Sequence, residues 1–137
     1  MMTTWNQEMG PSVLLVIEDD PAMRDSMTYA LKREGHKVHT APDGRSGVRM
    51  ARTLRPDMIL TDIILPDIDG VEVGRRIKAD RPVGQIPIIA MTGAATPSLF
   101  KRIRDAGLLG PILKPFRIAE LNRQIRQWLM TPAVFPL

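Results

Sequence analysis

The chain has no cysteine, few aromatic residues and no long apolar run. The lack of cysteine excludes disulfides, thiol catalysis and zinc–thiolate sites, and it fits a reducing compartment. The longest apolar run, Val13–Ile17, has the length of a strand, whereas a membrane-spanning helix needs about 20 apolar residues. The basic residues form no block and are not interleaved with aromatic residues, which favours a solvated surface. We therefore expect a soluble, cytoplasmic protein without a membrane segment.

What the chain does contain is typical of one globular domain. Its 137 residues are 44% hydrophobic and 25% charged, enough for one domain with a core and too short for two ordinary domains. Residues 1–11 show no periodicity and are expected to form a flexible leader. We expect the domain to span residues 12–130 and a short tail to span residues 131–137.

Short apolar runs alternate with stretches of helical periodicity throughout this domain. Val13–Ile17 is a continuous apolar run, typical of a strand that is buried on both faces. Asp20-Pro21 and Thr96-Pro97 are typical of helix starts, because Asp or Thr caps the helix and Pro fits its first turn. The predicted strands are residues 13–17, 37–41, 58–61, 86–91 and 111–113, and the predicted helices begin near residues 21, 44, 71, 97 and 118. This alternation predicts an α/β fold with a parallel sheet covered on both faces.

Charged and hydroxyl side chains follow four of the predicted strands. Glu18 and Asp19 follow the first strand, Asp62 the third, Thr92 the fourth and Lys114 the fifth. We expect these side chains to converge, because open α/β sheets bind ligands beyond the carboxyl ends of their strands. Carboxylates without His or Cys nearby suit Mg²⁺, and a carboxylate beside a metal ion can attack phosphorus. A lysine and a hydroxyl can hold phosphoryl oxygens, so the pattern indicates phosphoryl transfer.

Five motifs that carry these residues occur in a characteristic order. They are Leu15-Val16-Ile17-Glu18-Asp19-Asp20-Pro21, Asp57-Met58-Ile59-Leu60-Thr61-Asp62, Leu65-Pro66-Asp67-Ile68-Asp69-Gly70, Ile88-Ile89-Ala90-Met91-Thr92-Gly93 and Leu113-Lys114-Pro115-Phe116. From about Val13 to Leu129 the chain resembles the receiver domain of bacterial two-component response regulators, which has the CheY-like fold. The resemblance implies a doubly wound, five-stranded parallel sheet of order 2-1-3-4-5 with five helices, as in flavodoxin.

The resemblance also implies a role for each residue of the acidic cluster. Asp62 takes the place of the phosphoacceptor. Glu18 and Asp19 take the place of the acid pair that holds Mg²⁺, with Asp19 as the direct ligand and Glu18 acting through water. The main-chain carbonyl of Ile64 would supply a further oxygen. The implied function is a switch that a histidine kinase or a phosphotransfer protein phosphorylates on Asp62, and that signals to a downstream protein by contact.

The resemblance extends to the fourth and fifth strands but departs at one position. Thr92 takes the place of the hydroxyl that follows the phosphoryl group, and Lys114 takes the place of the family's lysine, which a cis bond joins to Pro115. The position three residues before the lysine, where receivers usually carry an aromatic residue, is Pro111. Because proline has no ring to rotate inward and no N–H, we expect the phosphorylated state to be read out differently.

Two apolar residues flank the expected phosphoryl group. Ile64 stands two residues after Asp62, and Ala94 stands two residues after Thr92. Polar residues are frequent at these positions in the family and influence how a water reaches the phosphoryl group. Neither side chain here can hydrogen-bond such a water, so we expect slow self-hydrolysis.

Other function classes remain open alternatives. A Mg²⁺-dependent phosphohydrolase of the haloacid dehalogenase type would also use an Asp nucleophile, but it needs a second Asp where Ile64 stands. A flavin carrier would need a phosphate loop where the acidic turn at residues 18–20 stands. A docking module that is never phosphorylated is a third alternative, although every position of the site is intact. No DNA-binding helix pair or catalytic domain follows Leu129, so we expect a stand-alone receiver that neither binds DNA directly nor catalyses another reaction.

Overall fold

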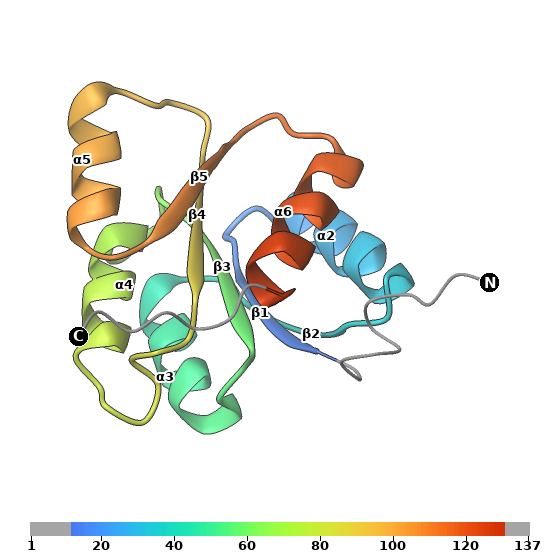
Figure 1. Ribbon diagram of the computed structural model, residues 1–137, viewed down its shortest axis with the longest axis horizontal. Coiled ribbons are helices and arrows are strands. Elements are labelled where there is room, and N and C mark those ends of the chain that lie inside the picture. Colours follow the sequence, from blue (N-terminus) through green and yellow to red (C-terminus); the bar gives the residue numbers. More distant parts are fainter. Residues whose placement is uncertain (1–11, 131–137) are drawn as a thin grey trace.

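Five parallel strands form the centre of the computed structural model, which describes residues 12–130 (Figure 1). They are β1 (Val13–Ile17), β2 (Lys37–Ala41), β3 (Met58–Asp62), β4 (Ile88–Thr92) and β5 (Leu109–Leu113). The strands pair in the order β2-β1-β3-β4-β5, and every neighbouring pair is parallel. The predicted fold class and strand order are therefore confirmed. The predicted leader, residues 1–11, and the predicted tail, residues 131–137, lie outside the described residues.

Helices cover both faces of this sheet. They are α2 (Pro21–Arg33), α3 (Gly44–Leu54), α4 (Gly70–Lys78), α5 (Pro97–Asp105) and α6 (Ile118–Met130). Figure 1 shows α3, α4 and α5 on one side of the sheet and α2 and α6 on the other. No helix between residues 12 and 130 is long and apolar enough to cross a membrane.

The two layers of helices enclose two hydrophobic cores, one on each face of the sheet. Alternate residues of β1 enter opposite cores: Leu15 and Ile17 pack with α3 and α4, whereas Leu14 and Val16 pack with α2 and α6. All four side chains are fully buried. This two-sided burial explains why β1 reads as a continuous apolar run rather than an alternating one.

Polar side chains cap four of the helices where the chain leaves the sheet. The side chains of Asp20, Asp43, Asp69 and Thr96 each accept a hydrogen bond from a main-chain N–H three residues further on. Such caps satisfy N–H groups that have no partner inside the helix. The predicted caps at Asp20 and Thr96 are therefore confirmed.

Two of the predicted strand starts were wrong, and the third and fourth strands each end one residue later than predicted, at Asp62 and Thr92. The fifth strand begins at Leu109 rather than Pro111, because a bulge lets the chain pass the proline. Leu109 pairs with Ile89 and Ile112 pairs with Met91, so β5 uses one residue more than β4 over this stretch. Gly110 supports the bulge with a φ of 90°, which glycine adopts without strain.

The other wrong start is that of the fourth strand, which lies at Ile88 rather than residue 86. Ile86 belongs to the preceding turn, where its N–H donates to the carbonyl of Val83. The Lys114–Pro115 bond is cis, as the resemblance implied, and the bond between Gly110 and Pro111 is also cis.

Candidate functional site

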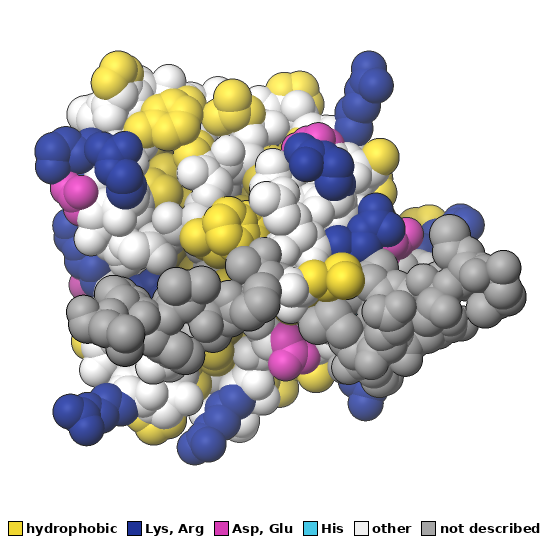
Figure 2. All heavy atoms as spheres, viewed as in Figure 1, with side chains coloured by type: hydrophobic (Ala, Val, Ile, Leu, Met, Phe, Trp, Pro, Cys, Tyr) yellow, Lys and Arg dark blue, Asp and Glu magenta, His cyan; other side chains and the backbone are white. Residues whose placement is uncertain are grey.

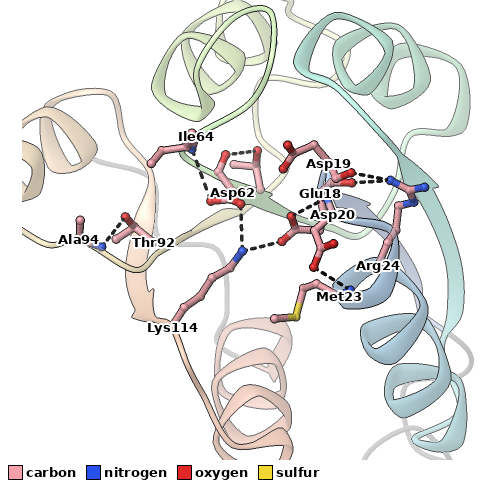
Figure 3. Close-up of polar contacts among 11 residues, drawn as sticks. Glu18, Asp19, Asp20, Met23, Arg24, Asp62, Ile64, Thr92, Ala94 and Lys114 are labelled. Atoms are coloured by element: carbon pink, nitrogen blue, oxygen red, sulfur yellow. Dashed lines mark hydrogen bonds and ion pairs between the residues drawn. The ribbon is translucent and has the colours of Figure 1, made fainter.

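The acidic residues and the lysine predicted from the strand ends lie together at one edge of the sheet (Figure 3). Glu18 and Asp19 follow β1, Asp62 ends β3 and Lys114 follows β5. In the strand order, β3 lies between β1 and β4, so Asp62 occupies the centre of the site. The long-range pairing of strands thus assembles side chains that are up to 96 positions apart in the sequence.

Three carboxylates form a compact oxygen cluster. One carboxylate oxygen from each of Glu18, Asp19 and Asp62 lies within 4.8 Å of the others. Glu18 and Asp62 are buried, whereas Asp19 is exposed to solvent. An oxygen-only donor set with one open side fits a hard divalent cation such as Mg²⁺, which keeps several of its waters. The residues present therefore fit the predicted metal.

Lys114 neutralises the buried part of this cluster. Its Nζ lies 2.6 Å from Glu18 Oε1 and 2.9 Å from Asp62 Oδ2. Burial alone would lower the pKa of Lys114, but its hydrogen bonds to the two carboxylates and their negative charges outweigh burial and raise that pKa. Burial together with the charge of Asp62 raises the pKa of Glu18, although the hydrogen bond from Lys114 opposes this rise. The ammonium group therefore holds two carboxylates that would otherwise repel each other.

The turn between β1 and α2 is held by its own side chains. The N–H of Asp20 donates to Glu18 Oε2 over 3.1 Å, and the carboxylate of Asp20 caps α2. Arg24 Nη1 donates to the main-chain carbonyl oxygens of Glu18 and Asp19, at 2.9 and 3.3 Å. The sequence analysis missed Arg24. The available signal was its spacing from the N-cap Asp20. A residue four places after the N-cap lies about one helical turn into the helix, close to the turn that precedes it.

Thr92 ends β4 and lies beside Asp62 on the side away from Asp19 (Figure 3). Its side chain is buried, and its Oγ1 accepts a hydrogen bond from the N–H of Ala94 over 3.2 Å. The N–H of Ile64 donates to Asp62 Oδ1 over 3.4 Å, and Ile64 is 70% exposed. The role of the Ile64 carbonyl oxygen as a metal ligand stays a prediction.

The loop between β3 and α4 is anchored to α3 by Asp67. The carboxylate of Asp67 accepts hydrogen bonds from the N–H groups of Gly44 and Arg45, both at 2.8 Å. Partial desolvation would raise the pKa of Asp67, but the hydrogen bonds from these main-chain donors outweigh it and lower that pKa to about 2.

The far end of the same loop is held against α5 and against β3. Asp69 forms an ion pair with Arg102 of α5 at 2.8 Å. Gly70 packs so closely on the carbonyl of Asp62 that a Cβ atom at this position would overlap it. Neither Asp67 nor Asp69 is part of the acidic cluster, and their contacts shape the loop instead.

Comparison with known proteins identifies the family. The family model described as "Response regulator receiver domain" matches residues 14–126. The chain is 49% identical over 113 residues to the transcriptional regulatory protein AfsQ1 of Streptomyces coelicolor, covering 82% of this chain and 49% of that protein. It is 34% identical over 118 residues to the DNA-binding dual master transcriptional regulator RpaA of Synechocystis, covering 85% of this chain and 48% of that protein.

The chain thus spans about half the length of these curated relatives. One of them is named as a DNA-binding regulator, so the relatives do not confirm the expected stand-alone organisation. That organisation, and the expected lack of direct DNA binding, stay predictions.

Solved structures show the same fold over nearly the whole chain. The receiver domain of the sensor histidine kinase PA1611 from Pseudomonas aeruginosa, solved with a magnesium ion in its active-site cleft, is 33% identical with a TM-score of 0.82. The match covers 89% of this chain and 100% of that one. The chemotaxis response regulator CheY4 of Vibrio cholerae is 25% identical with a TM-score of 0.81, covering 88% of this chain and 99% of that one. The fold, the acidic site and these matches agree, and the chain belongs to the response regulator receiver domain family.

Proposed function

We propose that this chain is a phosphoacceptor switch in which Asp62 receives a phosphoryl group from a histidine kinase or a histidine phosphotransfer protein. The observation that carries the proposal is the cluster of three carboxylates, with oxygens within 4.8 Å of one another and the ammonium group of Lys114 bonded to two of them. A single acidic residue on a surface has many possible roles. Three acids held together against electrostatic repulsion, with a lysine to balance them, suit the binding of a cation and a phosphoryl group.

In the proposed reaction, a carboxylate oxygen of Asp62 attacks the phosphorus atom of a phosphohistidine. An oxygen–phosphorus bond forms and the nitrogen–phosphorus bond breaks. The electron pair of that bond passes to the imidazole of the donor, which takes up a proton from solvent. A magnesium ion held by Asp19 and Asp62, by Glu18 through water and by the Ile64 carbonyl would neutralise the charge of the phosphoryl oxygens.

Lys114 and Thr92 would hold the transferred group on the other side. Nζ of Lys114 already lies 2.9 Å from an oxygen of Asp62, so it can contact a phosphoryl oxygen with little movement. The hydroxyl of Thr92 can donate to a second phosphoryl oxygen. Because Thr92 Oγ1 accepts a hydrogen bond from the N–H of Ala94, a movement of the Thr92 side chain would also displace Ala94. We expect this shift to be the first structural consequence of phosphorylation.

We propose that the output is contact with a downstream protein, and that the domain catalyses only its own phosphorylation and dephosphorylation. A phosphohydrolase of the haloacid dehalogenase type would need a second Asp two residues after Asp62. That position holds the exposed Ile64, which disfavours this alternative. We place the exchange in the cytoplasm, where kinases obtain ATP.

The test is phosphorylation of the purified chain by acetyl phosphate with Mg²⁺, followed by intact mass spectrometry. We expect a single added phosphate of about 80 Da, from the composition of a phosphoryl group, which disappears without Mg²⁺ and in Asp62→Asn. The matched control is Asp67→Asn, which removes a carboxylate of the same loop that lies outside the cluster. An adduct in Asp62→Asn, or none in the unaltered chain with acetyl phosphate or a phosphorylated histidine partner, would contradict the proposal.

A further inference from the structure

Arg24 contacts the main chain of the acidic turn rather than the acids themselves. Its Nη1 donates to the carbonyl oxygens of Glu18 and Asp19, at 2.9 and 3.3 Å (Figure 3). Within residues 12–130, the ion pairs closer than 4.0 Å do not include Arg24. A guanidinium group beside several carboxylates ordinarily pairs with one of them. Here its hydrogen bonds are directed at two successive peptide groups.

The direction of the Asp19 carboxylate depends on those peptide groups. In the described part of the chain, the side-chain hydrogen bonds at this turn involve Glu18 and Asp20, and none involves the carboxylate of Asp19. Asp19 is also exposed, so packing does not hold its side chain. The remaining constraint is the main chain on either side of it, which Arg24 binds at one edge and the Asp20 cap fixes at the other.

We infer that Arg24 is a positioning residue for the divalent cation: by binding the carbonyl oxygens of Glu18 and Asp19, it keeps the carboxylate of Asp19 facing Asp62. The inference rests on the proposed function, because it assumes that the carboxylate cluster binds Mg²⁺. Residues that orient metal ligands without touching the metal commonly affect metal affinity by about 10- to 100-fold. Arg24 would belong to this class.

Electrostatics and positioning predict opposite results for this residue. A guanidinium group repels a nearby cation, so the loss of its charge alone would strengthen Mg²⁺ binding. The loss of its two hydrogen bonds would free the turn and weaken Mg²⁺ binding. The sign of the change in affinity therefore separates the two effects.

The experiment is a titration of the full chain with MgCl₂ by isothermal calorimetry, without a phosphoryl donor. We expect the Kd for Mg²⁺ to rise about tenfold in Arg24→Ala. Arg24→Lys keeps the charge but places its ammonium group at the end of a shorter side chain than the Nη1 atom that makes both bonds, so its Kd should rise by a smaller factor. The control is Arg33→Ala, which removes the same charge from the last turn of α2, where Arg33 Nη1 donates to the hydroxyl of Tyr29. Its Kd should stay within about twofold of the original, as expected for a distant exposed charge.

A Kd in Arg24→Ala that is unchanged or lower would overturn the inference. If Arg24→Ala fails to fold, Arg24→Met decides, because it keeps an apolar stem of similar length and removes both donors, and an unchanged Kd in that variant overturns the inference equally. A second readout is the rate of phosphorylation by acetyl phosphate at different Mg²⁺ concentrations. Positioning predicts a higher half-saturating Mg²⁺ concentration with an unchanged rate at saturation. If the unaltered chain binds no Mg²⁺, the proposed function itself fails, so the two failures can be told apart.

Discussion

Replacing Lys114 with Met should destabilise the domain by about 3 kcal/mol at pH 8 in the absence of Mg²⁺. Nζ of Lys114 bonds Glu18 and Asp62 at 2.6 and 2.9 Å, and the side chain of Glu18 is only 1% exposed. Removing one partner of a buried ion pair typically costs about 3–5 kcal/mol, because the other charge is left without compensation. We take the lower end because the side chain of Lys114 is itself 19% exposed, so solvent screens part of the interaction.

The same substitution should make stability depend on pH. The pKa of Glu18 is already raised in the folded protein, chiefly by burial, and it would rise further without the opposing hydrogen bond from Lys114. Between its unfolded and folded pKa values, the folded variant binds more protons than the unfolded chain, so its stability falls as pH rises through this interval. Each pH unit within the interval changes the free energy of unfolding by up to about 1.4 kcal/mol. The loss should therefore be smaller at pH 5 than at pH 8.

Urea unfolding of Lys114→Met at pH 5 and pH 8, in EDTA, measures both effects. The control is Lys101→Met, which removes a lysine whose ion pair with Asp105 lies on the surface and should change stability little at either pH. A loss in Lys114→Met that is equal at the two pH values would refute the account of the buried carboxylates. No loss at pH 8 would refute the role of Lys114 in balancing them.

Three further predictions concern hydrolysis, pH and the loop. The phosphorylated chain should survive far longer than seconds, and Ile64→Asn or Ala94→Glu should shorten its half-life several-fold, as followed by intact mass over time; a half-life of seconds in the unaltered chain would contradict this. Burial lowers the pKa of His36 to about 4 in the folded protein, so between about pH 6.5 and pH 4 the unfolded chain binds a proton at His36 that the folded protein does not bind. Stability should therefore fall as pH falls through this interval, by up to about 1.4 kcal/mol per pH unit. His36→Asn should flatten that slope in urea unfolding between pH 4 and 7, and an unchanged slope would refute it. Asp67→Ala should lower the free energy of unfolding by about 1 kcal/mol, the usual value of a helix cap, because two N–H groups of α3 lose their acceptor. An unchanged free energy of unfolding in denaturant would contradict this prediction.

The fold, and the gathering of the site residues at one edge of the sheet, could be predicted because each rests on a local sequence pattern. The buried strand β1 reads as an unbroken apolar run, and helix caps such as Asp20 stand directly before their helices. The convergence of Asp62 and Lys114 followed from one general property of parallel sheets, that the carboxyl ends of the strands meet at one edge. No knowledge of side-chain positions was needed.

What could not be predicted depends on how elements pack against each other. The pairing of Asp69 with Arg102 joins residues 33 positions apart, and it depends on the placement of α5 beside α4. The bonds from Arg24 to two carbonyl oxygens depend on the exact path of the turn. The start of β5 was missed because Pro111 cannot donate a ladder hydrogen bond, and only the bulge at Gly110 shows how the strand continues past it.

The most direct test of the central claim is to locate the phosphoryl group on the chain. Borohydride reduces an aspartyl phosphate to homoserine, which peptide mass spectrometry can assign to one position. After phosphorylation with Mg²⁺ and acetyl phosphate, we predict homoserine at position 62 and at no other. Homoserine at the position of Asp19 or Asp67 instead, or phosphate retained on a histidine, would contradict the assignment of Asp62 as the phosphoacceptor.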